Sequence, residues 1–201
     1  AYKEALKIKP DYSEVYNNMG KAQNAKGDPE TAMACFKQAV LINPDYAEAY
    51  NNLGLAFSVK GEIKAAITSY EKALKIDPGY AEAHNNMANA LQEKGDLKGA
   101  IESYNKAVLI WPHYAEAYYN MGLAYKGMDN AEASILSYKN ALRIKPNYID
   151  AFLNIGIVLQ DSGHCEAAIN SYKQVLNIKP DCADAHFNMG VSLQDLGDLQ
   201  G

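Results

Sequence analysis

Six of the seven prolines in this sequence recur at a strict interval of 34 residues. They are Pro10, Pro44, Pro78, Pro112, Pro146 and Pro180. A fixed period of this length is the signature of an array of stacked structural repeats. Counting from the third residue after each proline, we predict one array over residues 1–201. It consists of a half repeat at 1–12, full repeats at 13–46, 47–80, 81–114, 115–148 and 149–182, and a partial repeat at 183–201.

Each repeat contains two amphipathic helical patterns. In the second full repeat, apolar residues recur at helical spacing over residues 49–57 and again over residues 66–74. Gly61 is expected to stop the first helix in a left-handed conformation, and Pro78 follows the second helix. A repeat is therefore a helix pair, and we call its first member the A helix and its second the B helix.

Helix starts are marked as well. Asp28 and Pro29 are predicted to be the N-cap and first-turn residue of a B helix, which accounts for the seventh proline. Residues 45–48, Asp-Tyr-Ala-Glu, resemble an acidic capping box. We therefore predict Asp45 as the N-cap of an A helix.

The repeat at 47–80 contains a spaced set of aromatic, small and proline residues: Tyr50, Leu53, Gly54, Phe57, Ala66, Tyr70 and Pro78. At a period of 34 residues, this set resembles the signature of the tetratricopeptide repeat. The same positions recur in register over nearly the whole chain. The resemblance implies an all-α fold, a right-handed superhelical solenoid of antiparallel helix pairs whose A helices line a concave groove. It also implies protein binding, because most members of the family bind other proteins.

Asparagine occupies the sixth repeat position of every A helix. We call these residues the amide stripe: Asn18, Asn52, Asn86, Asn120, Asn154 and Asn188. In the family fold this stripe faces the groove, where each amide could bond both polar groups of a peptide unit. We therefore predict that the stripe binds an extended peptide. The alternative is that each amide bonds a neighbouring helix and orders the stacking.

The C-terminal half of the predicted groove is more apolar. Repeat positions five and nine, which are mostly polar in the earlier repeats, change there to aromatic and aliphatic residues. We predict that these residues anchor peptide side chains: Tyr119, Leu123, Leu153, Ile157, Phe187 and Val191.

Charge and composition restrict the partner. A net charge of −5 without a cluster of Lys and Arg argues against nucleic acid, and no apolar run is long enough to insert into a membrane. The family's clamp for C-terminal carboxylates is also excluded, because repeat position two is acidic throughout and position six carries no Arg. We expect a protein or an extended peptide as the partner.

Residue types used in catalysis are present at unsuitable positions. Four potential zinc ligands are His164, Cys165, Cys182 and His186. However, about 14 helical residues should separate the two cysteines by roughly 20 Å. The run from Asp161 to His164 does not form a relay, which needs convergent side chains. We predict no enzyme, no cofactor and no metal site, and we interpret His84 and His186, at repeat position four, as core substitutions.

A second resemblance concerns the phrase AEAYNNLG at residues 47–54. Together with the amide stripe, it is similar to the repeats of bacterial and archaeal tetratricopeptide proteins. It also resembles those preceding the catalytic part of O-linked N-acetylglucosamine transferases, where such Asn residues hold extended substrates. No glycosyltransferase domain is present in this sequence. The alternative function is therefore the substrate-recruiting region of a larger enzyme.

Both ends of the sequence interrupt a predicted repeat. The last residues, Leu199-Gln200-Gly201, align with 97–99, which lead into a B helix. We therefore expect a fragment of a longer protein whose ends associate through apolar faces, formed by Leu6 and Ile8 at one end and Met189, Leu193 and Leu196 at the other.

Three cysteines without disulfide spacing favour a reducing compartment and the cytoplasm. Trp111 precedes a proline, at a position that is polar in the other repeats, and we therefore expect it to be exposed, either as a binding hot spot or as an ordinary surface residue.

Overall fold

The computed structural model describes residues 2–197, except for the side chains of residues 3 and 5. Within this range the chain forms twelve α-helices and no strand, which confirms the predicted all-α class. The helices are α1 (Tyr2–Ile8), α2 (Ser13–Ala25), α3 (Pro29–Ile42), α4 (Ala47–Val59), α5 (Ile63–Ile76), α6 (Ala81–Glu93), α7 (Leu97–Ile110), α8 (Ala115–Gly127), α9 (Ala131–Ile144), α10 (Ile149–Asp161), α11 (Cys165–Ile178) and α12 (Ala183–Asp195). The end of the predicted partial repeat, Leu199-Gln200-Gly201, lies outside the described residues.

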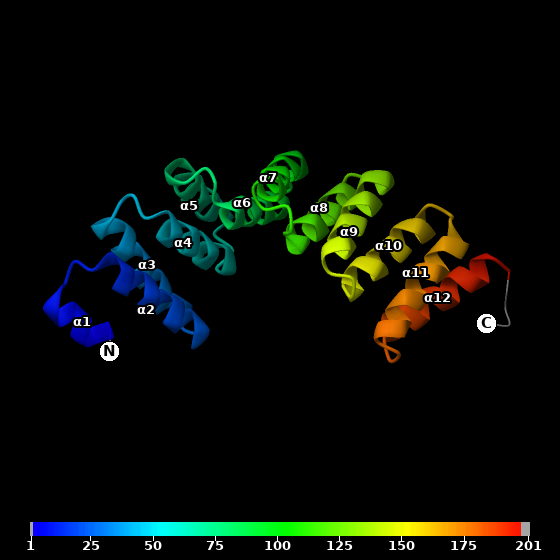
Figure 1. Cartoon of the computed structure of the whole chain (residues 1–201), viewed down its shortest axis with the longest axis horizontal. Helices are drawn as coiled ribbons and strands as arrows, with labels where there is room; N and C mark the ends of the chain where they lie inside the picture. Colours follow the sequence, from blue (N-terminus) through cyan, green and yellow to red (C-terminus); the bar gives the residue numbers. More distant parts are fainter. Residues whose placement is uncertain (1, 198–201) are drawn as a thin grey trace. The chain divides into compact units, whose positions relative to one another are not determined.

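The helices belong to two compact units, residues 1–110 and 111–201. In the first unit, drawn from blue to green in Figure 1, α2, α4 and α6 are A helices that each pack against the following B helix. Contacts of α3 with α4 and of α5 with α6 join successive pairs. The second unit repeats this scheme in α8 to α12. Both units are thus stacks of helix pairs, as expected for a solenoid of tetratricopeptide type.

Local sequence signals determine the turns within the pairs. Gly61 has φ +75° and ends α4 in the predicted left-handed conformation. Asp129 adopts φ 56° at the corresponding turn, which Asp tolerates better than most residues. Before α3, the Asp28 side chain accepts a hydrogen bond from the Thr31 backbone N–H at 3.1 Å, and Pro29 occupies the first turn. The predicted cap at Asp28 is confirmed.

The predicted capping role of Asp45 is wrong. Tyr46 is the N-cap of α4 and its side chain makes no capping bond. The Asp45 backbone N–H instead donates to Oδ1 of Asn43 at 3.1 Å, within the turn around Pro44. Because of this turn the N-cap is Tyr46 rather than Asp45, and α4 begins at Ala47. The Asp45 carboxylate is therefore not placed to accept hydrogen bonds from the free N–H groups of the first turn.

The interior of each helix pair is built around one aromatic ring. Tyr70 and Tyr172, on B helices, are 1% and 0% exposed. Facing the Tyr70 ring is Gly54, where a Cβ atom, if one were added, would lie only 2.5 Å from a ring carbon. Gly156 faces Tyr172 in the same way. Glycine at repeat position eight therefore lets the ring pack directly on the A-helix backbone.

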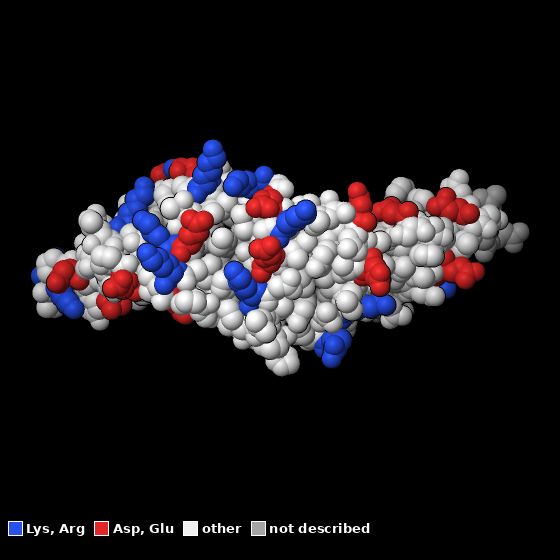
Figure 2. Space-filling model, turned by 90° about the horizontal axis from the view of Figure 1, so that it is seen from above, with Lys and Arg blue, Asp and Glu red and all other residues white. Residues whose placement is uncertain are grey.

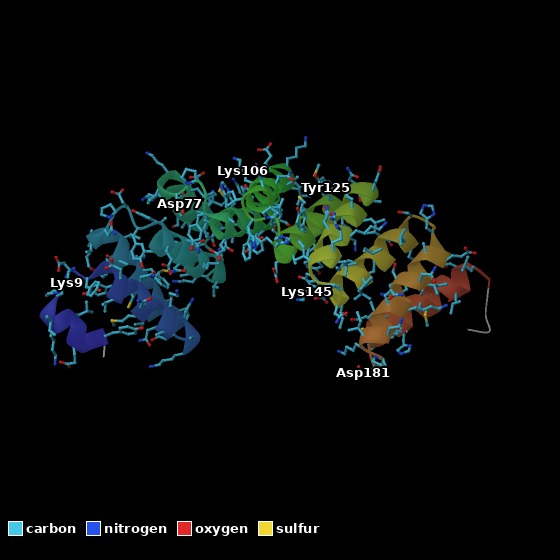
Figure 3. The ribbon with its side chains drawn as sticks, in the orientation of Figure 1. Lys9, Asp77, Lys106, Tyr125, Lys145 and Asp181 are labelled. Atoms are coloured by element: carbon cyan, nitrogen blue, oxygen red, sulfur yellow. The ribbon has the colours of Figure 1, made fainter. Side chains whose placement is uncertain are left out.

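Turns between repeats expose charged residues. Lys9, Asp77, Lys145 and Asp181, labelled in Figure 3, lie in or next to the turns that lead from a B helix to the next A helix. The Lys145 ammonium lies 4.3 Å from the centre of the Tyr148 ring, a cation–π contact within the turn. On the face seen in Figure 2, Lys and Arg interleave with Asp and Glu over the N-terminal helices, without a continuous basic patch.

The buried tyrosines predict an alkaline limit of stability. Burial raises the pKa of Tyr70, Tyr138 and Tyr172 to about 12, because the phenolate is poorly solvated there. Tyrosine in an unfolded chain titrates near ~10. The contribution of these buried, protonated phenols to the free energy of unfolding is therefore fully present below pH ~10 and is lost as the pH rises towards ~12.

In a titration followed by tyrosinate absorbance and helical circular dichroism, we expect the last phenols to ionise together with loss of helix. Tyr70→Phe, which removes one such phenol, should shift this transition to higher pH. Complete ionisation near pH ~10 with the helix signal intact would contradict the burial.

Candidate peptide-binding face of the A helices

Two adjacent asparagines divide their roles on each A helix of the N-terminal unit. Position five is buried, since Asn17, Asn51 and Asn85 are 0%, 4% and 5% exposed. Position six is more accessible, because Asn18 is exposed and Asn52 is half-buried. The first amide of the pair therefore belongs to the packed interior, and the second lies at the surface.

Hydrogen bonds connect these amides from one repeat to the next. Nδ2 of Asn52 donates to Oδ1 of Asn17 at 2.9 Å. In the following repeat, Nδ2 of Asn86 donates to Oδ1 of Asn51 at 3.0 Å. Each bond joins residues 35 positions apart. These two members of the amide stripe thus bond the preceding A helix, and the bonds use their Nδ2 atoms.

The C-terminal unit varies this arrangement. Nδ2 of Asn154 donates to the Tyr119 hydroxyl at 3.2 Å and to the Asp150 carbonyl oxygen at 2.9 Å. Tyr119 thus takes the acceptor role that Asn has at position five in the first unit. The next acceptor position is Leu153, which offers no polar side-chain atom to Asn188. Asn188 is half-buried, and so is Asn120, on α8.

An ion pair adds charge to the N-terminal part of this face. Lys21 Nζ lies 3.0 Å from Oε1 of Glu48, and this pair joins α2 to α4. Burial acts to raise the pKa of the Glu48 carboxyl, but hydrogen bonding and charge attraction from Lys21, with the nearby amides, lower it below its usual value. Glu48 is therefore a carboxylate at neutral pH. Burial, together with the charges of Glu82 and Glu48, raises the pKa of half-buried Tyr80 to about 12.

The predicted apolar anchors differ in accessibility. Tyr119 and Leu123 pack against the core of the C-terminal unit, and Tyr119 lies 4.9 Å from Tyr148 between ring centres. Leu153, Ile157 and Val191 are half-buried. Phe187, on α12, is 72% exposed, far more than the other predicted anchors.

Comparison with family models identifies the repeats. The model described as "TPR repeat" matches residues 21–58, 59–95, 88–129, 130–163 and 161–197, and a "Tetratricopeptide repeat" model matches residues 1–34. These matches cover the whole chain apart from its last residues.

The chain is a tetratricopeptide repeat protein.

Solved structures agree with this assignment. The MamA protein is 27% identical with TM-score 0.76, over 85% of this chain and 93% of its own. YrrB, described as a TPR protein with an unusual peptide-binding site, is 21% identical with TM-score 0.76, over 93% and 96%. Pseudomonas aeruginosa PilF is 22% identical with TM-score 0.81, over 92% and 85%. A search of curated proteins gives no significant match.

The family assignment and these similar structures support a general role for this tetratricopeptide protein as a protein-interaction scaffold. The role of the buried position-five residues of the scaffold was not predicted from the sequence. Asn17 and Asn51 act as hydrogen-bond acceptors for the next repeat. The spacing of 35 residues between an Asn at position five and the Asn at position six of the next repeat is the sequence signal for these bonds. In Asn85 the corresponding Oδ1 is buried without a hydrogen-bond partner.

Other candidate residues of the tetratricopeptide protein lie apart. Cys165 begins α11 and Cys182 is the N-cap of α12, at opposite ends of the intervening helix. Among the described residues, no three His, Cys, Asp or Glu side chains are placed to hold a metal ion. None of the described helices is long and apolar enough to cross a bilayer.

The faces predicted for self-association contain both exposed and partly covered residues. Ile8 is 88% exposed and Leu196 is 46% exposed. Leu6, Met189 and Leu193 are half-buried. Association of the ends stays a prediction.

Proposed function

We propose that this protein is a non-catalytic scaffold that binds an extended peptide along the A helices. The amide stripe supplies hydrogen bonds to the peptide backbone, and the apolar anchors of the C-terminal unit hold peptide side chains. The observation that supports this most directly is the geometry of the stripe. Where Asn52, Asn86 and Asn154 bond within the protein, they do so through Nδ2, and these bonds leave Oδ1 as an acceptor.

Bonding within the protein and bonding to a peptide are compatible in this arrangement. The bond from Asn52 to Asn17 fixes the orientation of the amide before any ligand arrives, which reduces the entropy lost on binding. With neighbouring A helices about 10 Å apart, one amide per repeat would serve about three residues of an extended peptide. The peptide backbone N–H groups would donate to the Oδ1 atoms.

A peptide-display library of unstructured 12-mers, selected on the full chain, tests this proposal. The selected peptides are titrated against the double variant Asn52→Ala/Asn86→Ala. Two lost hydrogen bonds of about 0.5–1.5 kcal/mol each should weaken binding by roughly 5- to 150-fold. The free energy of unfolding is measured alongside, because Asn17 and Asn51 lose their donors.

The matched control replaces exposed asparagines of B helices, with Asn105→Ala and Asn177→Ala. These variants should bind the selected peptides like the unaltered chain. Equal affinity of the stripe variant and the control variant would refute the amide-stripe site. The alternative function, recruitment of substrates for a larger glycosyltransferase-like enzyme, uses the same stripe and stays a prediction.

A further inference from the structure

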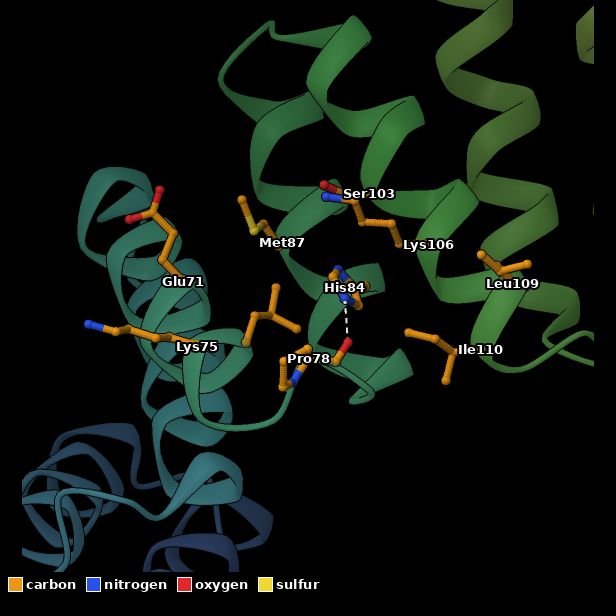
Figure 4. A pocket seen from close by; sticks show the side chains of 10 residues that line it. Glu71, Lys75, Pro78, His84, Met87, Ser103, Lys106, Leu109 and Ile110 are labelled. Carbon is orange, nitrogen blue, oxygen red and sulfur yellow. Dashed lines mark hydrogen bonds between the residues drawn. The ribbon is translucent and has the colours of Figure 1, made fainter.

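A cavity of about 480 Å³ opens between α5, α6 and α7 in the N-terminal unit. Its apolar lining includes Leu74, Met87, Leu109 and Ile110, and His84 lies at its centre in Figure 4. We call it the His84 pocket. Its volume is within the range of ligand pockets, ~300–1,000 Å³. No residue of the amide stripe lines it.

One lining residue of the pocket differs between two successive repeats, both of which carry a groove at equivalent positions. His84 and Lys106 occupy the positions that Tyr50 and Lys72 have in the preceding repeat. There, the Lys72 ammonium lies 5.4 Å from the centre of the Tyr50 ring. At the later position the phenol ring is replaced by the smaller imidazole ring of His84. Lys106 therefore has no phenol ring at the position where Tyr50 forms a cation–π contact with Lys72.

The corresponding groove of the preceding repeat covers a different part of its B helix. It is lined by Tyr50 and runs along the first part of α5, from Lys64 to Lys72. The His84 pocket instead continues to Leu109 and Ile110, near the end of α7. The His84 pocket therefore extends closer to the C-terminal end of its B helix than the groove of the preceding repeat does.

His84 is held in a neutral, fixed state. It is 8% exposed, and its Nε2 donates to the Pro78 carbonyl oxygen at 3.1 Å. Burial lowers the pKa of His84, and the charge of Lys106 lowers it further, against the opposing effect of the bond to Pro78. A neutral imidazole that donates from Nε2 keeps Nδ1 as an acceptor.

Charge around the pocket is asymmetric. In Figure 4 the Lys106 side chain extends from α7 towards the centre of the pocket, whereas the ends of Glu71 and Lys75 point outwards from α5. An inward-pointing ammonium above an apolar floor is complementary to an aromatic ring with a nearby anion. This is notable in a chain whose net charge is −5.

We propose that the His84 pocket binds an aromatic side chain of a partner protein with a carboxylate beside it in sequence. The ring lies against Leu74, Met87 and Ile110, beneath Lys106, where it restores the lysine–aromatic pair formed by Lys72 and Tyr50. The carboxylate pairs with the Lys106 ammonium. This site is independent of the proposed peptide-binding face.

Methionine methyl NMR on the full chain tests the pocket. Met87 lines it, and the other five methionines are internal references. The probes are acetyl-Asp-Phe-Asp-amide and, for comparison, acetyl-Asp-Leu-Asp-amide. We expect the Phe probe to shift the Met87 signal selectively, with at least about tenfold higher affinity than the Leu probe.

Variants locate the site without removing the core. His84→Tyr fills the pocket with the residue of the preceding repeat, and should weaken Phe-probe binding about tenfold or more. The matched control is His186→Tyr, since Nε2 of exposed His186 makes the same bond to the Pro180 carbonyl, at 2.9 Å. Lys106→Gln should weaken binding severalfold, while Lys75→Gln should not. Asn52→Ala/Asn86→Ala should leave the Met87 response unchanged, which separates this site from the amide stripe.

Four results would overturn the proposal. They are an unshifted Met87 signal at saturating Phe probe, equal binding of the Leu probe, undiminished binding to His84→Tyr, and undiminished binding to Lys106→Gln. A Met87 shift that appears without probe as the protein concentration rises, and that Trp111→Ala abolishes, would assign the pocket to a second copy of the chain instead.

Discussion

Replacing Asn17 by Ala is expected to lower the free energy of unfolding by about 2–4 kcal/mol. Asn17 is 0% exposed, donates to the Tyr46 hydroxyl at 3.2 Å and accepts from Asn52 at 2.9 Å. The variant loses both bonds and leaves a small cavity between α2 and α4. Chemical denaturation followed by circular dichroism measures the loss.

The adjacent residue provides the control. Asn18 is exposed, and Asn18→Ala should change the free energy of unfolding little or raise it by up to ~0.7 kcal/mol, because Ala is the better helix former. Two variants at neighbouring positions thus separate interior amides from surface amides. Equal stability of the two variants would show that the bonds between repeats contribute nothing measurable.

Replacing Gly54 by Ala is expected to lower the free energy of unfolding by about 1–3 kcal/mol. The new methyl group would lie 2.5 Å from a carbon of the Tyr70 ring, which is 1% exposed and has no room to move freely. The better helix propensity of Ala, about 1 kcal/mol over Gly, offsets only part of the overpacking.

Gly190→Ala is the matched control at the same repeat position. A Cβ at Gly190 meets no atom within 4 Å, so this variant should be stabilised by about 0.5–1 kcal/mol. Opposite signs for Gly54→Ala and Gly190→Ala are the expected result, and stabilisation by both would contradict the close packing. Ala88 already occupies this position in its repeat, where the Tyr104 hydroxyl bonds Asn89 and Gln92, which shows that a methyl group is tolerated when its surroundings differ.

Local features of the fold were predictable because their causes are local. Gly61 and Asp28 act within a few residues of their position, and the structure places both as the sequence indicates. Asp45 was misplaced because the turn around Pro44 decides where α4 begins. The identity of a candidate cap residue does not by itself predict the geometry of the turn that precedes the helix.

Features of the candidate site depend on contacts between repeats. The position-six asparagines were visible as a stripe, but their bonds to Asn17 and Asn51 depend on how successive A helices are offset. His84 was correctly interpreted as a buried core substitution, yet the cavity that adjoins it depends on the spacing of α5 and α7. The same interpretation is wrong for His186, which is exposed on α12.

The bonds between asparagines also have a direction, and this has a consequence for how the array can grow. The repeat at 47–80 carries both a donor to its predecessor, Asn52, and an acceptor for its successor, Asn51. A duplicated copy of residues 47–80 inserted after residue 80 would therefore find both partners in place. The series stops at Asn85, whose Oδ1 has no hydrogen-bond partner, and Leu153 offers no side-chain acceptor further along. A gene duplication that lengthens this protein would therefore preserve the bonding pattern if it copied the repeat at 47–80.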